Sequence, residues 1–405
     1  MKLLIRVFVI IFFISFSWKN LLSQVAVKGV KVYTMADAAI DDGIVLVKGS
    51  KVERVGPASD IHIPAGYKVL TAKIVTPGLI DAHTVVGLAG YLNQSHDQDQ
   101  LEKSDVIQPE LRAIDAYNAR EKLVEWLRYL GVTTIHTGHG PGALMSGQTM
   151  ILKTVGDKAE DTAIKTSAMV AATLGSAVSN NFESPGTGSK GVAMLRTELV
   201  KARSYAEKSK NEDQTKRPAR DLRMEVLVRI LNKETPVLIT AQTSTDIMSA
   251  LRLAKEFDIE IVLDGAAEAY LLIDEVKSAN VPVILHPTMV RNYGDTIDAT
   301  YETAARLKAA GIPFAIQSGY ESYVPKTRVV LYEAAIAVAN GLTFEDALAA
   351  LTIDAARILK IQDRVGSLET GKDADIVLFD GDPFEYTTKV CGVVISGEVV
   401  SEECR

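Results

Sequence analysis

The chain of 405 residues is 47% hydrophobic and 23% charged, a composition typical of a globular protein with room for one large and one small domain. Its formal net charge of −7 provides no basic surface, which excludes nucleic acid as a partner. Only two cysteines are present, Cys391 and Cys404, and this number excludes a metal site built from cysteines. The two could pair in an oxidising compartment, but two unpaired thiols are the interpretation that we favour.

Residues 1–24 have the features of a secretory signal peptide. Lys2 and Arg6 supply the positive charge, residues 7–18 form an apolar core too short to span a bilayer comfortably, and a plausible cleavage site lies near Gln24. An uncleaved N-terminal anchor is the alternative, whereas no other stretch is long and apolar enough for a membrane helix. We therefore predict an exported protein, periplasmic or extracellular, without stable membrane insertion after cleavage.

Both ends of the remaining chain are rich in short strands. Alternating apolar residues and glycine-containing turns mark residues 25–75, and the same pattern returns in residues 361–405. Strand-rich ends around a long middle predict a small composite β-sandwich domain to which both ends of the chain contribute.

The middle of the chain, residues 76–360, alternates between strand and helix patterns. Apolar residues three and four positions apart predict helices from Arg112 to Tyr129 and from Ser244 to Phe257. The predicted strands of this segment are residues 79–83, 131–136, 150–153, 168–172, 237–240, 259–263, 281–285 and 312–316. About eight strand–helix units in succession predict an α/β fold with a closed (β/α)8 TIM-type barrel.

Two segments interrupt this repeat. Residues 176–223 combine several glycines with a charged run, and they predict a partly helical insertion over the barrel mouth. Residues 87–109 form a long polar loop after the first barrel strand. Long loops in compact domains are often functional, so both segments are candidates for the surroundings of a site.

The most informative stretch is residues 76–85, TPGLIDAHTV, which reads as a turn followed by a buried strand with a polar end. It resembles the first barrel strand of the amidohydrolase superfamily, whose pattern is Pro-Gly-apolar-Ile-Asp-x-His-x-His. Residues 364–375, RVGSLETGKDAD, closely resemble the segment with which that family re-enters its sandwich. The resemblance extends over nearly the whole chain after residue 24, is closest to the imidazolonepropionase-like branch, and implies the same barrel and composite sandwich.

The resemblance also implies one or two divalent metal ions at the barrel mouth, with a metal-bound water as nucleophile and an aspartate as its proton acceptor. The family takes its ligands from the His-x-His of the first strand, from histidines that end strands five and six, and from an aspartate that ends strand eight. In this chain His83 matches the first ligand. The changed positions hold Val85, Thr240, Asp264 and either Ser318 or Gly319. Of these replacements, Asp264 could still bind a metal.

Four histidines lie at or just beyond the ends of predicted barrel strands, where active sites of such barrels are found. We predict a rearranged metal site in which His83, His136 and Asp264 bind a divalent ion, and zinc suits imidazole and carboxylate ligands best. His139 and His286 are the predicted catalytic residues, because a histidine would have to accept the proton in place of the missing aspartate. We expect all five side chains to converge on one cavity.

Together these features predict a hydrolase that acts on non-peptide C–N bonds of a small molecule, such as a cyclic amide or ureide. The main alternative is a catalytically inactive, metal-free relative that binds a small ligand or a partner at the barrel mouth. A structural subunit and a Ser–His hydrolase using Ser146 or Ser318 are further possibilities, although no nucleophile elbow accompanies either serine. The sequence leaves the substrate and the oligomeric state open.

Overall fold

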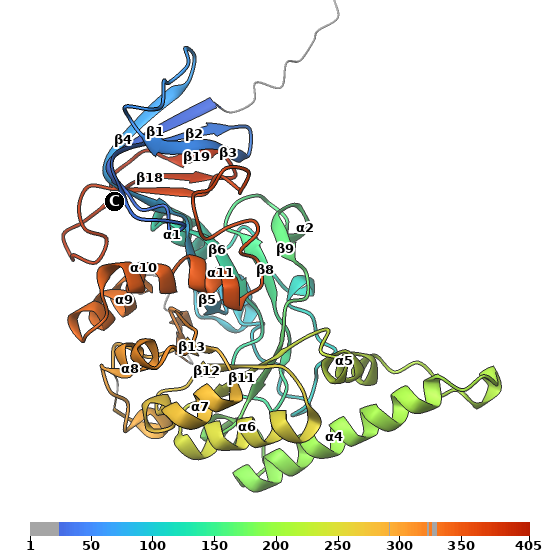
Figure 1. Ribbon diagram of the computed structural model, residues 1–405. Helices are drawn as coiled ribbons and strands as arrows, with labels where there is room; N and C mark the ends of the chain where they lie inside the picture. The colour runs from blue at the N-terminus through green and yellow to red at the C-terminus, as the bar shows by residue number, and fades with distance from the viewer. Residues whose placement is uncertain (1–23, 291, 322–323, 326–329) are drawn as a thin grey trace, which may run out of the picture.

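The computed structural model describes residues 24–290, 292–321, 324–325 and 330–405. Residues 1–23, and with them nearly all of the predicted signal peptide, lie outside the described ranges. The described chain is mixed α/β, with a sheet from both chain ends at the top of Figure 1 and the strands and helices of the middle segment below it. None of the helices in the described ranges has the length and apolar character that a membrane crossing requires.

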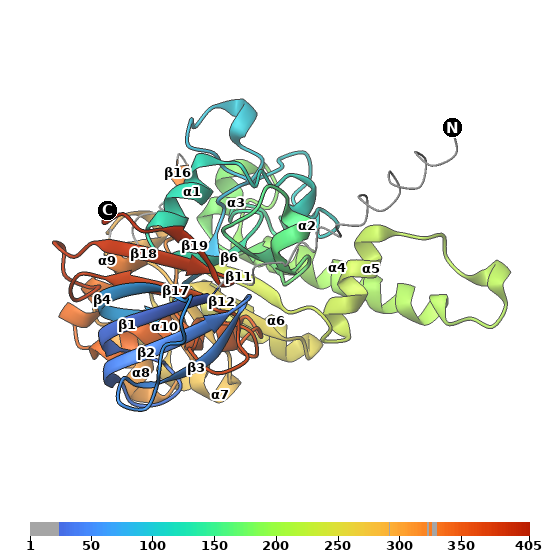
Figure 2. The same ribbon diagram turned by 90° about the horizontal axis from the view of Figure 1, so that it is seen from above.

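The two ends of the chain share one seven-stranded sheet. In spatial order its strands are β19 (Glu398–Ser401), β18 (Val390–Ile395), β17 (Ile376–Phe379), β4 (Lys68–Pro77), β1 (Gln24–Val32), β2 (Ile40–Lys48) and β3 (Lys51–Pro57). β17 runs antiparallel to β4 with Leu378 opposite Val75, so the C-terminal strands extend the N-terminal ones. Alternating side chains such as Val25 and Val27 pack with Leu378 in a separate small core. The strands of the predicted sandwich are thus hydrogen-bonded as one continuous sheet (Figure 2).

The middle segment contains two larger hydrogen-bonded ladders and one short hairpin. Its strands are β5 (Leu79–Thr84), β6 (Val132–Thr137), β7 (Gly147–Gln148), β8 (Met150–Lys153), β9 (Ala163–Lys165), β10 (Val170–Thr173), β11 (Val237–Ala241), β12 (Ile261–Gly265), β13 (Val283–Leu285), β14 (Phe314–Ile316), β15 (Tyr320–Glu321) and β16 (Val324–Pro325). β10 to β14 are parallel neighbours in one ladder, and β5 and β6 are parallel neighbours in the other. Parallel strands end on the same side, so their terminal polar residues gather at one edge.

The strand predicted at residues 150–153 forms as β8, but it runs antiparallel to β6. No helix of the described chain lies between β6 and β8, and a direct connection of this kind returns the chain in the opposite direction. β9 continues antiparallel to β8, and β7 is antiparallel to β10. β8 is therefore a further departure from the predicted strand–helix repeat, and closure of an eight-stranded barrel stays a prediction.

Helices cover the outside of the ladders (Figure 1). They are α1 (Lys122–Tyr129), α2 (Ala159–Thr162), α3 (Ser176–Asn181), α4 (Gly188–Ser209), α5 (Leu222–Leu231), α6 (Ser244–Phe257), α7 (Ile273–Ala279), α8 (Thr303–Ala310), α9 (Val330–Ala339), α10 (Phe344–Ala350) and α11 (Ile353–Ile358). α6 matches its predicted span, because the Thr243 hydroxyl accepts the backbone N–H of Asp246 at 3.2 Å and caps the helix there. The helix predicted from Arg112 begins only at Lys122, after the cap residue Glu121.

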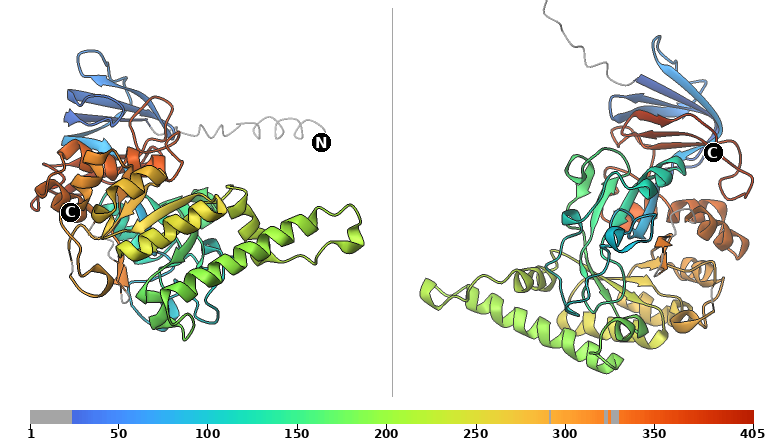
Figure 3. Two further views of the ribbon diagram at one scale, coloured as in Figure 1. Left: turned by 60° about the horizontal axis from the view of Figure 1, so that its bottom comes forward. Right: turned by 180° about the vertical axis from the view of Figure 1, so that it is seen from behind.

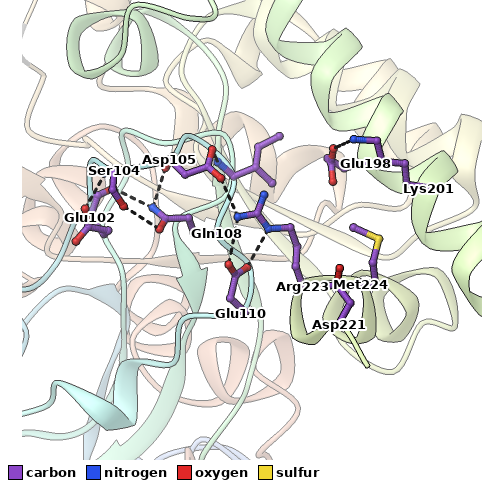
Figure 4. Close-up of polar contacts among 11 residues, drawn as sticks. Glu102, Ser104, Asp105, Gln108, Glu110, Glu198, Lys201, Asp221, Arg223 and Met224 are labelled. Carbon is purple, nitrogen blue, oxygen red and sulfur yellow. Dashed lines mark hydrogen bonds and ion pairs between the residues drawn. The ribbon is translucent and has the colours of Figure 1, made fainter. Parts of the chain in front are cut away.

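The insertion at residues 176–223 is partly helical, as predicted, but much of it forms an arm that projects from the molecule. α4 packs against α5 and α6, and its C-terminal part extends away from the body in both views of Figure 3. Figure 4 shows the attachment of the arm at its base, where the Arg223 guanidinium donates to Asp105 at 2.8 Å and to Glu110 at 3.2 Å. The expectation that this segment covers the barrel mouth is wrong for the arm.

Cys391 and Cys404 form a disulfide, so the preference for two unpaired thiols is wrong. The register of the terminal hairpin explains the pairing: Val393 lies opposite Ser401, and continuing along both strands brings Cys391 beside the segment that follows β19. The backbone N–H of Arg405 also donates to the Val390 carbonyl at 3.0 Å, which holds the end of the chain against β18.

Candidate active site

A cavity of about 40 Å³ lies at the C-terminal ends of the parallel strands. Its walls come from β5, β11 and β12 and from the segments that follow β13 and β14. The polar lining side chains are His83, Thr84, Thr240, Gln242, Asp264, His286 and Gln317. A cavity of this size has room for one small polar group or very few water molecules, so only the end of a ligand could enter it.

His83 and Asp264 form a buried pair in this cavity. His83 lies one residue before the end of β5 and Asp264 one residue before the end of β12, and both side chains are almost fully buried. The His83 Nδ1–H group donates to Asp264 Oδ1 at 2.8 Å. This bond fixes the orientation of the imidazole ring and points its Nε2 atom away from the carboxylate.

Two further side chains donate to the Asp264 carboxylate. The Thr240 hydroxyl donates to Oδ2 at 2.6 Å, and the Gln317 amide donates to Oδ1 at 2.7 Å. Thr240 is well placed because it lies directly opposite Asp264 in the parallel ladder of β11 and β12. Both oxygens of the carboxylate are therefore occupied by protein donors.

The pKa values of both members of the pair are shifted from their usual ranges. Burial lowers the pKa of His83, but the negative charge of Asp264 and the hydrogen bond to it outweigh burial and raise the net pKa above the usual histidine value. Burial raises the pKa of Asp264, but the charge of His83 and the hydrogen bonds from His83, Thr240 and Gln317 outweigh it and lower the net pKa. An imidazolium next to a carboxylate is the state that both shifts favour.

The Nε2 atom of His83 is buried, and no described residue makes a hydrogen bond to it. Because the ring lines the cavity, a bound ligand or water is the partner that this atom can reach. The site thus presents one oriented imidazole nitrogen to whatever enters the cavity.

His136 lies beside His83, with 5.7 Å between the two ring centroids, but it is not part of the cavity lining. Its Nδ1–H group donates to the Ala82 carbonyl at 2.8 Å, and its Nε2 atom accepts from the Thr149 hydroxyl at 2.6 Å. Burial and the positive charge of His83 lower the pKa of His136 to about 3, so the ring is neutral. Neither nitrogen is available to a metal ion in this arrangement, which supports a structural role.

His139 and His286, the two predicted catalytic residues, differ in position. His139 is buried against Gly147, away from the cavity lining, and burial lowers its pKa to about 4. His286 lines the cavity, and its Nδ1 atom lies 3.7 Å from Glu333 Oε1. The structure thus brings His83, Asp264 and His286 of the five expected residues to one cavity.

Sequence reasoning missed two carboxylate partners at the strand ends. Gln317 was not considered as a donor to Asp264, although it directly precedes the position compared with the family aspartate. Ser318, considered as a nucleophile, instead donates its hydroxyl to Asp81 Oδ2 at 2.5 Å and its backbone N–H to Oδ1 at 3.0 Å. Burial raises the pKa of Asp81 to about 6 although both hydrogen bonds oppose this shift. Ser146, the other candidate serine, donates to the Ala171 carbonyl at 3.5 Å.

The chain is similar in sequence and in structure to amidohydrolases. The profile of the amidohydrolase family matches residues 74–400. An imidazolonepropionase from Fusobacterium nucleatum is 25% identical, over 85% of this chain and 87% of that protein. An amidohydrolase structure from Thermotoga maritima superposes with a TM-score of 0.88 at 28% identity, covering 94% of this chain and 100% of that chain. An adenosine deaminase from Xanthomonas campestris with bound zinc shares the fold, with a TM-score of 0.54, 16% identity and coverage of 94% and 93%.

Members of this family typically use a divalent metal, but the donors of this cavity do not fit one as they are arranged. His83 Nδ1, both oxygens of Asp264 and both nitrogens of His136 already have hydrogen-bond partners within the protein. Within the described ranges, no group of three or more His, Cys, Asp or Glu side chains is placed to hold a metal ion. The ligand set expected from the sequence therefore does not assemble around a common point.

Proposed function

Because the chain belongs to the amidohydrolase family, as an imidazolonepropionase-like member with a TIM-barrel-type α/β fold, we propose that it hydrolyses a non-peptide C–N bond in a small cyclic amide or ureide. The family and these relatives support a hydrolase with a small-molecule substrate. The observation that carries the proposal is the buried Nε2 atom of His83, which has no partner among the described residues and lines the strand-end cavity.

His83 is suited to bind and polarise the carbonyl of an amide. Asp264 holds the Nδ1–H group, so the Nε2–H group of the imidazolium can donate to a carbonyl oxygen inside the cavity. This bond strengthens as the oxygen gains negative charge during attack on the carbonyl carbon. Because the donor is already oriented and buried, little reorganisation is needed when the charge develops.

His286 is the candidate for activating water. It lines the same cavity, and its Nδ1 atom lies 3.7 Å from Glu333 Oε1. Glu333 is itself held by the backbone N–H groups of Thr288 and Met289, at 2.6 and 2.9 Å. In the proposed reaction a water oxygen bonds to the carbonyl carbon and its proton passes to His286. The C–N bond then breaks, and the proton passes from His286 to the leaving nitrogen.

The sequence predicts a rearranged metal centre made of His83, His136 and Asp264. The hydrolysis steps proposed above need no metal ion. The same donor arrangement supports a second candidate, a relative that binds a small ligand without turnover. Its specific support is that Thr240 and Gln317 hold the carboxylate of Asp264, which leaves the pair able to bind a carbonyl group even without a nucleophile.

The proposal is tested with a panel of cyclic amides and ureides, with hydrolysis and binding measured in parallel. His83→Gln should lower kcat/KM by roughly 10²–10³-fold, the usual cost of removing one oriented donor to a developing oxyanion. His62→Gln changes an exposed histidine that lies outside the cavity lining and should leave the rate unchanged. Equal rates for wild type and His83→Gln contradict the role of His83, and binding without hydrolysis favours the second candidate.

We also propose that the protein is exported to the periplasm or the extracellular space. The composition of residues 1–24 supports export, and the Cys391–Cys404 disulfide adds an independent reason. Disulfides persist in oxidising compartments and are rare in the reducing cytosol.

A further inference from the structure

We infer that Thr240 and Gln317 hold Asp264 against His83 in place of a metal ion, and that this cavity operates without a divalent cation. The inference concerns the same cavity as the proposed function, and it rests on that function only where turnover is measured. Its support is the hydrogen-bonding state of the carboxylate, the strand register that produces it, and the surroundings of the pair.

The described hydrogen bonds of the Asp264 carboxylate all come from protein donors, and Oδ1 already accepts two of them. Oδ1 accepts from His83 and Gln317 at 2.8 and 2.7 Å, and Oδ2 accepts from Thr240 at 2.6 Å. A zinc ion about 2.0–2.2 Å from Oδ1 would displace at least one of its two donors. Each displaced donor would then be buried without a partner, which opposes uptake of the ion.

Backbone register fixes the donors in place. Thr240 on β11 is the ladder partner of Asp264 on β12, so its hydroxyl reaches the carboxylate from the neighbouring strand. Gln317 follows β14, and its amide also donates to the Ile284 carbonyl on β13 at 3.3 Å. The Gln317 side chain therefore spans from its own strand to β12 and β13. Because the donors come from different strands, rotation of any one donor side chain leaves the carboxylate held by the others.

The surroundings of the pair supply few further ligands. His136 is engaged through both ring nitrogens by Ala82 and Thr149. Val85, two residues after His83 in the cavity wall, is fully buried and apolar. Of the three residues predicted to bind metal, only His83 retains a ring nitrogen without a described partner. His286 adds a second imidazole to the cavity lining, but among the described residues no group of three or more His, Cys, Asp or Glu side chains is placed to hold one ion, as a zinc site requires.

The decisive measurement is the metal content of the full chain after exhaustive dialysis, followed by calorimetric titration with zinc. The inference expects no stoichiometric metal, no shift of the melting temperature with added zinc, and an unchanged rate in the presence of a chelator. A stoichiometric ion that disappears in Asp264→Asn overturns it.

A double variant tests the structural reason. Val85→His combined with Thr240→His adds two imidazoles at the cavity and removes one donor to Asp264, so zinc should bind more tightly than to wild type because the number of available ligands rises. The control is Thr245→His, which adds an imidazole at an exposed position of α6 outside the cavity lining and should leave zinc affinity unchanged. The inference is contradicted if the double variant folds but binds zinc no more tightly than wild type, or if the control gains as much zinc affinity as the double variant. If circular dichroism shows that the double variant does not fold, the metal content of wild type decides alone.

These outcomes separate the inference from the proposed function. A metal-free chain that hydrolyses none of the cyclic amides removes the proposed function and leaves the inference intact. A chain that binds a metal ion and hydrolyses cyclic amides removes the inference and leaves the hydrolase activity of the proposed function intact.

Discussion

His83, His136 and His139 have the same ring in three different environments. His83 is paired with a carboxylate, His136 bonds to a carbonyl and a hydroxyl, and His139 has no hydrogen-bond partner among the described residues. The carboxylate raises the pKa of the first ring, whereas burial lowers the pKa of the other two. Partner and burial, rather than residue type, therefore decide which histidine can do chemistry.

Burial of His139 as a neutral ring makes stability depend on pH. Its pKa is about 4 in the folded chain, against about 6.5 for an unfolded histidine. As pH falls below about 6.5 the unfolded state binds the proton first, so the free energy of unfolding decreases. His139→Gln should remove this contribution, which amounts to roughly 2 kcal/mol between pH 6.5 and pH 5.

Denaturant unfolding of both proteins at the two pH values measures the difference. The pKa of His136 is lowered as well, but His136 is present in both proteins, so its contribution to the pH dependence of stability cancels in the comparison. The same loss of stability in wild type and His139→Gln would show that His139 does not titrate as a buried neutral group.

Among the elements, β8 has a role that its antiparallel direction makes possible. Its last residue, Lys153, is buried and bonds to Asp375, and its ammonium lies 3.1 Å from Asp373. Asp373 also accepts from Lys51 at 2.7 Å and from Arg364 at 2.8 Å. These ion pairs join the middle segment to the strand-rich ends just before β17.

Lys153→Met should therefore destabilise the fold strongly. The change leaves two buried carboxylates without their shared cation, and breaking a buried ion pair typically costs about 3–5 kcal/mol of unfolding free energy. Lys201→Met is a suitable control, because Lys201 is exposed and its pair with Glu198 on α4 should contribute less than about 1 kcal/mol. Similar unfolding free energies for the two variants would contradict the joining role of Lys153.

At the scale of the whole molecule, the disulfide and the N-terminal segment lead to one prediction. Protein purified from an exporting bacterial host should begin near residue 25 and should show no reactive thiol after denaturation, because Cys391 and Cys404 are paired. N-terminal sequencing and thiol titration measure both properties. An intact Met1 in cytosolic protein with two reactive thiols would contradict the proposed export.

Much of the architecture could be predicted from local patterns. The periodicity of apolar residues and the positions of turn residues predict the strands at both chain ends, the helix from Ser244 to Phe257 and most strands of the middle segment. The stretch around His83 identified the family and the edge of the sheet where the cavity lies. Such features depend on residues that are close together in the chain, which is why the sequence alone carries them.

Only the tertiary structure decided which side chains meet. Asp264 is separated by 181 residues from His83 and by 53 from Gln317, and their contact depends on strand order and register. The same holds for the direction of β8, the pairing of Cys391 with Cys404, and the engagement of both His136 nitrogens. Local periodicity encodes the face on which a side chain lies but not its partner across the sheet, and that partner determines whether a carboxylate is open to an ion or held by the protein.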